Sequence, residues 1–216
     1  MYISFCFGDP LSDKNTISII SELGKGNKID LVSNIICPVE DLVKIPRNGN
    51  VAIATSYHPY HWSLEDFLDK RNKIDNSGIR CGCVLIVGYP PRINEIPDWV
   101  KKLEELNIEA RIMPFHGLYK KQEYPASYTE EEKKIIFGEV EKIYHTSDWV
   151  LNSPKGKKCR VGKNYVFINQ MGDINACYMK ASKLGNVLDK NLELENNFIC
   201  PSETCPCPDM WEYIDE

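Results

Sequence analysis

Five cysteines in the C-terminal part of the chain are the side chains with the clearest capacity for chemistry. They are Cys159, Cys177, Cys200, Cys205 and Cys207. Thiolates gathered in this way typically ligate zinc or an iron–sulfur cluster. The chain has 9 cysteines, an odd number, and its N-terminus lacks the charged start and long apolar run of a signal peptide. Both features argue against a disulfide framework. We therefore expect a thiolate-ligated metal centre in the reducing environment of the cytoplasm.

The segment between the first two of these cysteines has the pattern of a β-hairpin. A strand-like run, Tyr165–Ile168, precedes the turn Asn169–Asp173. Gly172 in that turn can take the positive φ that closes a tight hairpin. Cys159 before the first strand and Cys177 at the end of the second are then placed to face one site. Zinc prefers four tetrahedral thiolates, which five cysteines also supply, so the residues leave both iron–sulfur and zinc open.

The chain before the cysteine-rich part must position any further functional residues. Its sequence alternates strand and helix patterns. Near-continuous apolar strands of this kind are typical of a parallel sheet covered by helices, and so of an α/β fold. We expect strands at 2–6, 28–33, 51–56, 81–87 and 108–113, and helices at 13–23, after Ser63, and at 97–106. Residues 114–128 have the composition of a loop. The capping box Thr129–Glu132 then opens another helix.

These patterns divide the chain into three parts. Residues 1–122 are expected to form an α/β part of about five βα units, 123–150 a linker and helix, and 151–216 a small Cys-rich metal domain that contains the hairpin. A domain that small needs a metal staple to be stable.

Charge and hydropathy limit the partners. Lys and Arg number 26 against 31 Asp and Glu, a formal charge of -5, and the basic residues are dispersed apart from the run Lys155–Arg160. The electrostatic footprint of a nucleic-acid-binding protein is therefore absent. No apolar run approaches the ~20 residues of a membrane-spanning helix. We expect neither a nucleic-acid nor a membrane partner.

The order of several motifs resembles one enzyme family. Twelve residues separate Cys159 from Gly172, and four more separate Gly172 from Cys177. Upstream and downstream segments add to this pattern: Phe7–Leu11, Val32–Asn34 and Leu184–Val187. Together they resemble the radical S-adenosylmethionine (SAM) superfamily with a C-terminal SPASM or twitch domain.

The resemblance implies a partial (β/α) barrel with a parallel sheet, one auxiliary 4Fe–4S cluster in the C-terminal domain, and substrates that are peptides or other natural-product precursors. Gly8, Asp9 and Pro10 are similar to the family's Gly-Gly-Glu-Pro element, which would face the amino group of SAM. Ser56 and His58 lie at the predicted carboxyl end of a strand, where α/β folds place ligands. We therefore include them among the candidate SAM-binding residues.

One departure from the family matters as much as the match. Radical SAM enzymes open the barrel with a Cys-x3-Cys-x2-Cys loop that holds the SAM-cleaving cluster, and this chain has no such loop. Cys6 and Cys37 are far apart, and Cys81 and Cys83 fall within a strand pattern. The chain thus resembles the C-terminal two-thirds of such an enzyme. We expect it not to cleave SAM by itself and to need a missing N-terminal segment or a partner protein. The alternative is a non-catalytic zinc-binding module whose α/β part is an interaction domain.

Overall fold

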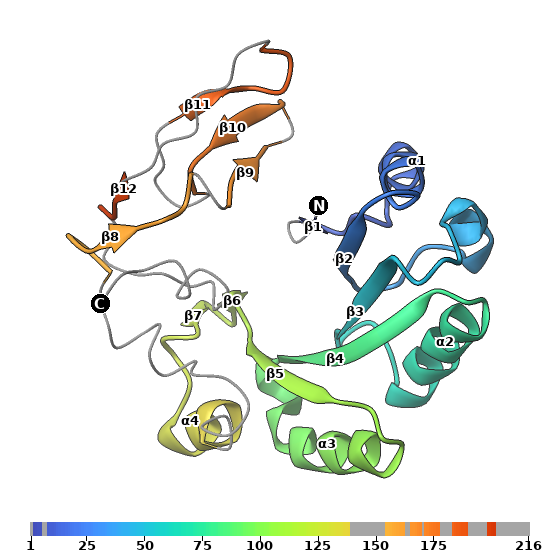
Figure 1. Cartoon of the computed structure of the whole chain (residues 1–216). Coiled ribbons are helices and arrows are strands. Elements are labelled where there is room, and N and C mark those ends of the chain that lie inside the picture. The colour runs from blue at the N-terminus through green and yellow to red at the C-terminus, as the bar shows by residue number, and fades with distance from the viewer. Residues whose placement is uncertain are drawn as a thin grey trace. The chain divides into compact units, whose positions relative to one another are not determined.

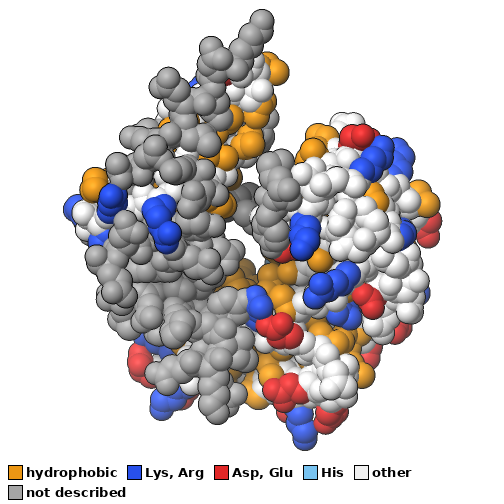
Figure 2. All heavy atoms as spheres, viewed as in Figure 1, with side chains coloured by type: hydrophobic (Ala, Val, Ile, Leu, Met, Phe, Trp, Pro, Cys, Tyr) orange, Lys and Arg blue, Asp and Glu red, His pale blue; other side chains and the backbone are white. Residues whose placement is uncertain are grey.

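The computed structural model divides into two compact units, Met1–Glu139 and Val140–Glu216, and each is described by itself. The structure describes residues 2–5, 8–138, 154–162, 165–169, 171–177, 183–189 and 198–201. Within these ranges no helix is long and apolar enough to span a bilayer. Figure 2 shows basic and acidic side chains interspersed over the visible face of the first unit, in keeping with the dispersed charge of the sequence.

A five-stranded parallel sheet forms the centre of the first unit, in the order β1-β2-β3-β4-β5 (Figure 1). The strands are β1 Tyr2–Phe5, β2 Lys28–Ser33, β3 Val51–Tyr57, β4 Arg80–Gly88 and β5 Ala110–Pro114. Every neighbouring pair is parallel. The α/β fold class with a parallel sheet, predicted from the apolar strands, is confirmed.

Four α-helices begin within one residue of the predicted positions: α1 Lys14–Leu23, α2 Leu64–Asn76, α3 Ile96–Glu105 and α4 Glu130–Phe137. The structure adds two 3-10 helices that were not predicted, η1 Val39–Lys44 and η2 Pro90–Glu95. The side chains of Asp13 and Ser63 accept hydrogen bonds from backbone N–H groups in the first turns of α1 and α2. The capping box at Thr129 is present in full, with Glu132 bonded back to the cap. Such caps satisfy N–H groups that have no partner within the helix.

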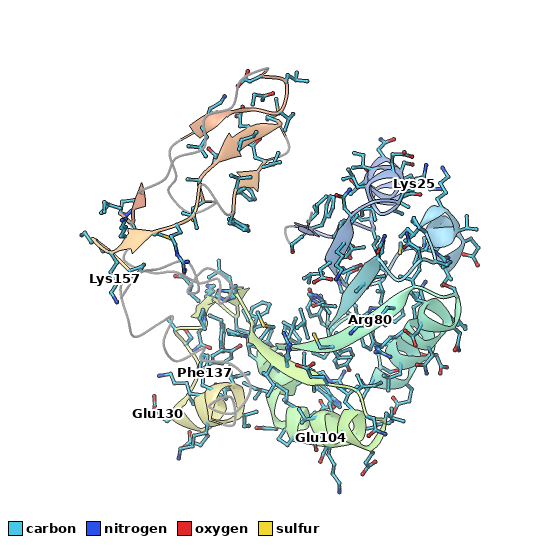
Figure 3. All side chains as sticks on the ribbon, viewed as in Figure 1. Lys25, Arg80, Glu104, Glu130, Phe137 and Lys157 are labelled. Carbon is cyan, nitrogen blue, oxygen red and sulfur yellow. The ribbon has the colours of Figure 1, made fainter. Side chains whose placement is uncertain are left out.

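The helices α1, α2 and α3 lie on one side of the sheet (Figure 1). The strand residues that face them are buried: Ile29, Leu31, Val51, Ile53, Thr55, Tyr57, Val84 and Ile86. Side chains from the sheet and the helices meet in the layer between them (Figure 3). Tyr57 packs there against the rings of Phe67 and Trp99 at centroid distances of 5.2 and 5.1 Å. This layer is the core of the first unit.

The opposite face of the sheet is less tightly packed among the described residues. Eight of the strand residues that point to it are half-buried: Asp30, Val32, Ala52, Ala54, Leu85, Val87, Arg111 and Met113. Ser56, at the end of β3, points to the same face and is buried. We call this set the open face. Parallel sheets normally have both faces packed against other elements. The open face is therefore the side of this sheet on which a ligand or another element could bury further surface.

A β-bulge in β4 decides which of its residues face the core. Ile53 pairs with Cys81 but Thr55 pairs with Val84, so β4 carries an extra residue at this point. Arg71, only 7% exposed, donates from Nη2 to the carbonyls of Cys81 and Gly82 at 2.9 Å each. The guanidinium thus satisfies carbonyl groups at the bulge.

Within residues 114–128, the prediction of a loop is wrong in part. This stretch contains an antiparallel hairpin of β6 Gly117–Tyr119 and β7 Gln122–Tyr124. Its turn residues Lys120 and Lys121 have φ of 47° and 66°, the left-handed conformation that two-residue hairpin turns need. Little in the sequence indicates this turn, because Asn and Gly, the usual residues there, are absent.

The second unit is built from short strands. They are β8 Lys158–Cys159, β9 Phe167–Ile168, β10 Asp173–Asn175, β11 Lys183–Asn186 and β12 Phe198–Ile199. One antiparallel sheet has the order β11-β10-β9, and β12 pairs with β8. The predicted hairpin is confirmed as β9–β10, and Gly172 in its turn has φ 77°. A Cβ there would also lie 2.8 Å from Cγ2 of the exposed Val187, so any other residue would have to displace that side chain in addition to taking the positive φ.

The second unit buries few of its described apolar side chains. Val161, Ile174 and Ala176 are buried, whereas Ile168 is 52% exposed. Residues 139–153, between α4 and the first described residues of this unit, lie outside the described part of the chain. The domain boundaries expected at 122 and 150 stay predictions.

Candidate functional site

The carboxyl ends of β1, β2 and β3 bring together the predicted ligand-binding residues of the first unit. Asp9 lies in the loop after β1, and its carboxylate binds the end of β2. Oδ1 accepts hydrogen bonds from Ser33 Oγ at 2.8 Å and from Leu11 N at 3.0 Å. Oδ2 accepts from Asn34 N at 2.9 Å. Since a carboxylate oxygen has two lone pairs, these bonds leave one accepting position on Oδ2.

Gly8 and Pro10 shape the loop around this carboxylate. Gly8 has φ 69°, and a Cβ built on it would meet no atom within 4 Å. The left-handed conformation turns the chain sharply, and the space beside it is open. Pro10 is buried next to Leu11, which is 1% exposed. The loop is therefore anchored on one side of Asp9 and open on the other.

Ser56 and His58 lie at the end of β3 and are hydrogen-bonded to each other. His58 Nε2 is 3.0 Å from Ser56 Oγ, and Nδ1 is 3.0 Å from Tyr60 Oη. Burial, with a smaller contribution from His61, holds the pKa of His58 below its usual 6.5, while the charge of Asp9 opposes that shift. His58 thus interacts electrostatically with Asp9 across the strand ends. The imidazole is favoured in its neutral form.

A row of aromatic rings continues from this loop along the carboxyl ends of β4 and β5. Tyr60 contacts His61 at a centroid distance of 4.3 Å and Tyr89 at 5.2 Å. Tyr89 in turn contacts Phe115 at 5.7 Å and Tyr119 at 5.6 Å. We call these five residues the aromatic row. The aromatic row was not predicted as a site. The sequence indicated only the neighbourhood of His58 as a place for a ligand. Tyr119 could not be assigned to it, because the hairpin that positions Tyr119 was not predicted.

Ser33 and Tyr60 were also missed as site residues. Ser33 is 2% exposed and donates to Asp9, and Tyr60 contacts His58. Ser33 ends a predicted strand, and Tyr60 lies in the loop that follows another, four residues after its predicted end. That position was the available signal, because strand ends of parallel sheets share one edge.

Three cysteines of the first unit have the properties of packing residues. Burial raises the pKa of Cys37 to about 11 and that of Cys81 to about 12. It also raises the pKa of Cys83. A metal ligand or nucleophile needs a low thiol pKa. These side chains therefore act as small apolar residues, which agrees with their strand and loop positions.

In the second unit, two of the five candidate metal ligands, Cys159 and Cys200, belong to neighbouring paired segments. Pairing of β12 with β8 sets Phe198 opposite Cys159, and Cys200 exchanges backbone hydrogen bonds with residues 156–157 at 2.8 and 2.9 Å. Cys159 is 5% exposed, and Cys177 lies two residues after the end of β10 and is half-buried. Cys205 and Cys207 lie outside the described residues. Within the described ranges, no three His, Cys, Asp or Glu side chains are grouped closely enough to hold a metal ion.

The turns around Cys177 are held by a polar network. Asp173 Oδ1 accepts from Lys183 Nζ at 2.6 Å and from Asn186 Nδ2 at 3.0 Å, and both bonds hold the pKa of Asp173 below its usual value. Asn169 Oδ1 accepts from the N–H groups of Met171 and Asp173. These bonds fix the hairpin that leads into Cys177.

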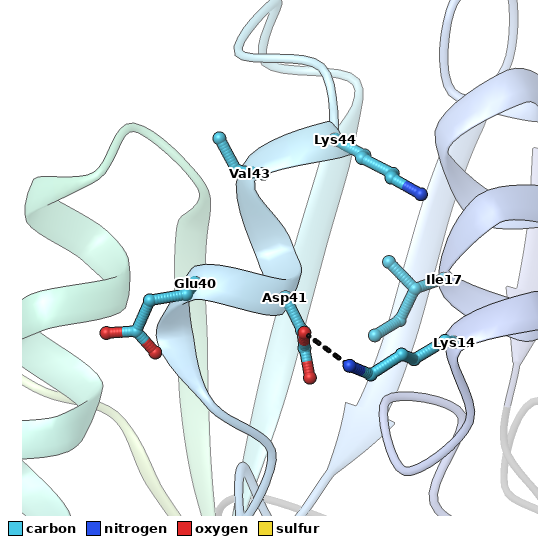
Figure 4. A pocket seen from close by; sticks show the side chains of 6 residues that line it. All are labelled: Lys14, Ile17, Glu40, Asp41, Val43 and Lys44. Atoms are coloured by element: carbon cyan, nitrogen blue, oxygen red, sulfur yellow. Dashed lines mark ion pairs between the residues drawn. The ribbon is translucent and has the colours of Figure 1, made fainter.

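One small pocket is lined by none of the strand-end residues described above. It has a volume of about 90 Å³ and lies between α1 and η1 (Figure 4). Its lining includes Lys14, Asp41 and Lys44, and Lys14 and Asp41 form an ion pair at 3.2 Å. Such a volume holds only a few water molecules, and we assign it no role.

Comparison with solved structures gives fold relatives. The chain is similar to a structure described as native anSMEcpe with bound AdoMet, with a TM-score of 0.55 and 11% sequence identity, over 87% of this chain and 63% of that one. It is also similar to a hexahistidine-tagged form of anSMEcpe with bound AdoMet, with a TM-score of 0.52 and 11% identity, over 85% of this chain and 60% of that one. At this identity the likeness concerns the fold.

The chain thus spans about 63% of the length of the first of these structures. No protein-family model matches the sequence, and no curated protein matches it.

Proposed function

We propose that this chain is part of a radical SAM enzyme: its first unit faces SAM and substrate, and its second unit holds an auxiliary 4Fe–4S cluster. The observation that carries the proposal is the parallel sheet with an open face, in a fold that resembles two structures with bound AdoMet. Ligands of parallel α/β sheets bind at the carboxyl ends of the strands. Gly8, Asp9, Ser56 and His58 all lie at that edge.

In the proposed SAM site, each residue has a role that follows from its environment. The open space at Gly8 admits a ligand close to the backbone. The remaining acceptor position on Asp9 Oδ2 suits an ammonium group, because a carboxylate is a strong acceptor for a charged donor. Ser33 and Asn34 orient this carboxylate through their hydrogen bonds. His58 and Ser56 provide neutral polar groups to the same ligand.

For the proposed cluster, the candidate ligands are Cys159, Cys177, Cys200, Cys205 and Cys207, and the donor chemistry fits. Thiolates suit iron–sulfur clusters, and the basic run Lys155–Arg160 beside Cys159 offsets the negative charge of several thiolates. When bound, such a cluster supplies electron transfer. Zinc is the alternative occupant that the same donors would accept.

The cluster that cleaves SAM needs three further thiolates, which we propose come from a preceding segment or a partner protein. β1 pairs with β2 and with no other described strand, and we propose that this segment or partner adds a strand to the other edge of β1. We propose a peptide as the substrate, since the aromatic row offers a surface for apolar side chains.

The test is binding and cleavage of SAM by the anaerobically reconstituted protein. We expect weak binding by equilibrium dialysis, lost in Asp9→Ala but kept in Asp69→Ala, a matched change on the exposed side of α2. With dithionite, no deoxyadenosine should form. Absence of SAM binding would contradict the proposed SAM site. Deoxyadenosine production above that of Cys177→Ser would contradict the need for further thiolates.

A further inference from the structure

Three polar side chains at the end of β3 form a continuous hydrogen-bonded chain. Ser56 Oγ lies 3.0 Å from His58 Nε2, and His58 Nδ1 lies 3.0 Å from Tyr60 Oη. The inner member, Ser56, is 8% exposed, and the outer member, Tyr60, is 47% exposed. The chain therefore leads from a buried hydroxyl to solvent.

The chemistry of the three groups allows a proton to move along it. Each hydroxyl can donate and accept, and a neutral imidazole carries one N–H and one lone pair. Both hydrogen bonds can thus be made in either tautomer of His58. Burial and the nearby His61 favour neutral His58, while Asp9 favours the cation. A neutral imidazole with an anion in its surroundings is a suitable proton acceptor.

The inner end of the chain belongs to the open face. Ser56 pairs with Leu85, and it alternates along β3 with the core-facing Thr55 and Tyr57, so it points to the same side as Ala54. Ala52 and Ala54, the open-face residues that precede it on β3, have small, half-buried side chains. A ligand on this face at the carboxyl end of β3 would therefore meet the Ser56 hydroxyl.

The outer end is fixed by contacts that do not involve the three polar groups. Arg92 Nη1 donates to the carbonyl of Pro59 at 2.8 Å, and its Nε and Nη2 bind both carboxylate oxygens of Glu95. The guanidinium also lies 5.0 Å from the centre of the Trp99 ring. His61 N donates to the carbonyl of His58 at 2.9 Å. Tyr60 is thus held in a defined turn.

We propose that Ser56, His58 and Tyr60 are a proton relay between a ligand O–H or N–H group on the open face and solvent. The ligand proton passes to Ser56 Oγ as the Ser56 proton passes to His58 Nε2, which leaves a ligand anion and an imidazolium. The Nδ1 proton then moves to Tyr60 Oη as the Tyr60 proton moves to water. No electron is transferred. The identity of the ligand rests on the proposed function, but the relay does not.

The relay is tested by NMR on the metal-free protein with labelled histidine. The first measurement is exchange of the His58 imidazole N–H with water. Tyr60→Phe should slow this exchange at least about tenfold, because it keeps the ring contacts and removes the hydroxyl outlet. Tyr119→Phe, which removes a hydroxyl from the same aromatic row, should leave it unchanged. Exchange that is unchanged or faster in Tyr60→Phe would overturn the relay, since His58 would then exchange directly with water.

The second measurement needs no variant. A working relay interconverts the two His58 tautomers, so the two ring nitrogens should show averaged chemical shifts in the unchanged protein. A single fixed tautomer at neutral pH would overturn the proposal. Because neither measurement requires SAM, a cluster or substrate, a failed relay is distinguishable from failure of the proposed SAM site.

Discussion

The carboxylate of Asp9 joins the loop after β1 to the end of β2, so it has a structural role whatever it binds. Asp9→Asn keeps the size of the side chain but removes the charge that strengthens the bonds to Ser33, Leu11 and Asn34. We expect a loss of about 1–3 kcal/mol in the free energy of unfolding, measured by urea denaturation. Asp69→Asn is the control. A change within about 0.5 kcal/mol, the usual size at exposed surface sites, would contradict this role.

His58 gives the first unit a pH dependence whose sign follows from its environment. Its pKa lies below 6.5 in the folded protein, where burial disfavours the cation. Between the folded and unfolded pKa values, the unfolded chain binds more protons, so stability rises with pH in that window. On acidification from pH 7, the free energy of unfolding should therefore fall.

The comparison variant is His58→Gln. Its free energy of unfolding should fall less over the same pH range, because glutamine has no proton to bind. His116→Gln replaces an exposed histidine and serves as the control. Denaturation at a series of pH values between 7 and 5 measures all three proteins. If His58→Gln and the unchanged protein have the same pH dependence, His58 is not buried as described.

At the scale of elements, Tyr128 ties the last helix of the first unit to the sheet. Its hydroxyl donates to the carbonyl of Gly88 at 2.6 Å and accepts from Phe115 N at 2.8 Å. The ring is 3% exposed, and burial raises the pKa of Tyr128 to about 12. Tyr128→Phe leaves both buried backbone groups without this partner.

We expect Tyr128→Phe to lower the free energy of unfolding by about 1–3 kcal/mol, the cost of leaving buried polar groups unsatisfied. Tyr119→Phe, at a half-buried position of the aromatic row, should cost less. Thermal or urea unfolding compares the two variants. Equal stability of the two would mean that water replaces the Tyr128 hydroxyl.

How far the sequence predicts each element depends on whether its signal is local. Caps at Ser63 and Thr129, the apolar strands and the Gly172 turn were all predicted, because each depends on a few neighbouring residues. The bulge in β4 was not, since it depends on Arg71 from α2 reaching the carbonyls. The Lys120–Lys121 turn was not predicted either, because it has lysines at the left-handed positions where Asn and Gly are usual.

The same distinction applies to the candidate site. Asp9 was predicted because its loop resembles the Gly-Gly-Glu-Pro element of radical SAM enzymes, and Ser56 and His58 because they stand at a strand end. The partners Ser33, Tyr60 and Tyr119 depend on how separate loops meet. The cysteine ligands are a pattern of composition and spacing. Which four of them act together depends on long-range placement, for which spacing carries no information.

At the scale of the whole molecule, the second unit should depend on its metal for folding. Its described strands are two to four residues long, and few of its described apolar side chains are buried. Such a unit is expected to couple folding to metal binding. Limited proteolysis should therefore cut residues 140–216 faster in Cys177→Ser than in the metal-loaded protein. Equal rates with and without metal would refute the coupling, and residues 1–139 provide the internal control.

The central claim is an iron–sulfur cluster held by the C-terminal cysteines. The most direct measurement is iron, sulfide and zinc analysis of protein purified without oxygen and kept in its full length. We predict about four iron atoms and a matching amount of sulfide per chain, with both lost in Cys177→Ser. Stoichiometric zinc without sulfide would contradict the claim and would instead support a zinc-binding module.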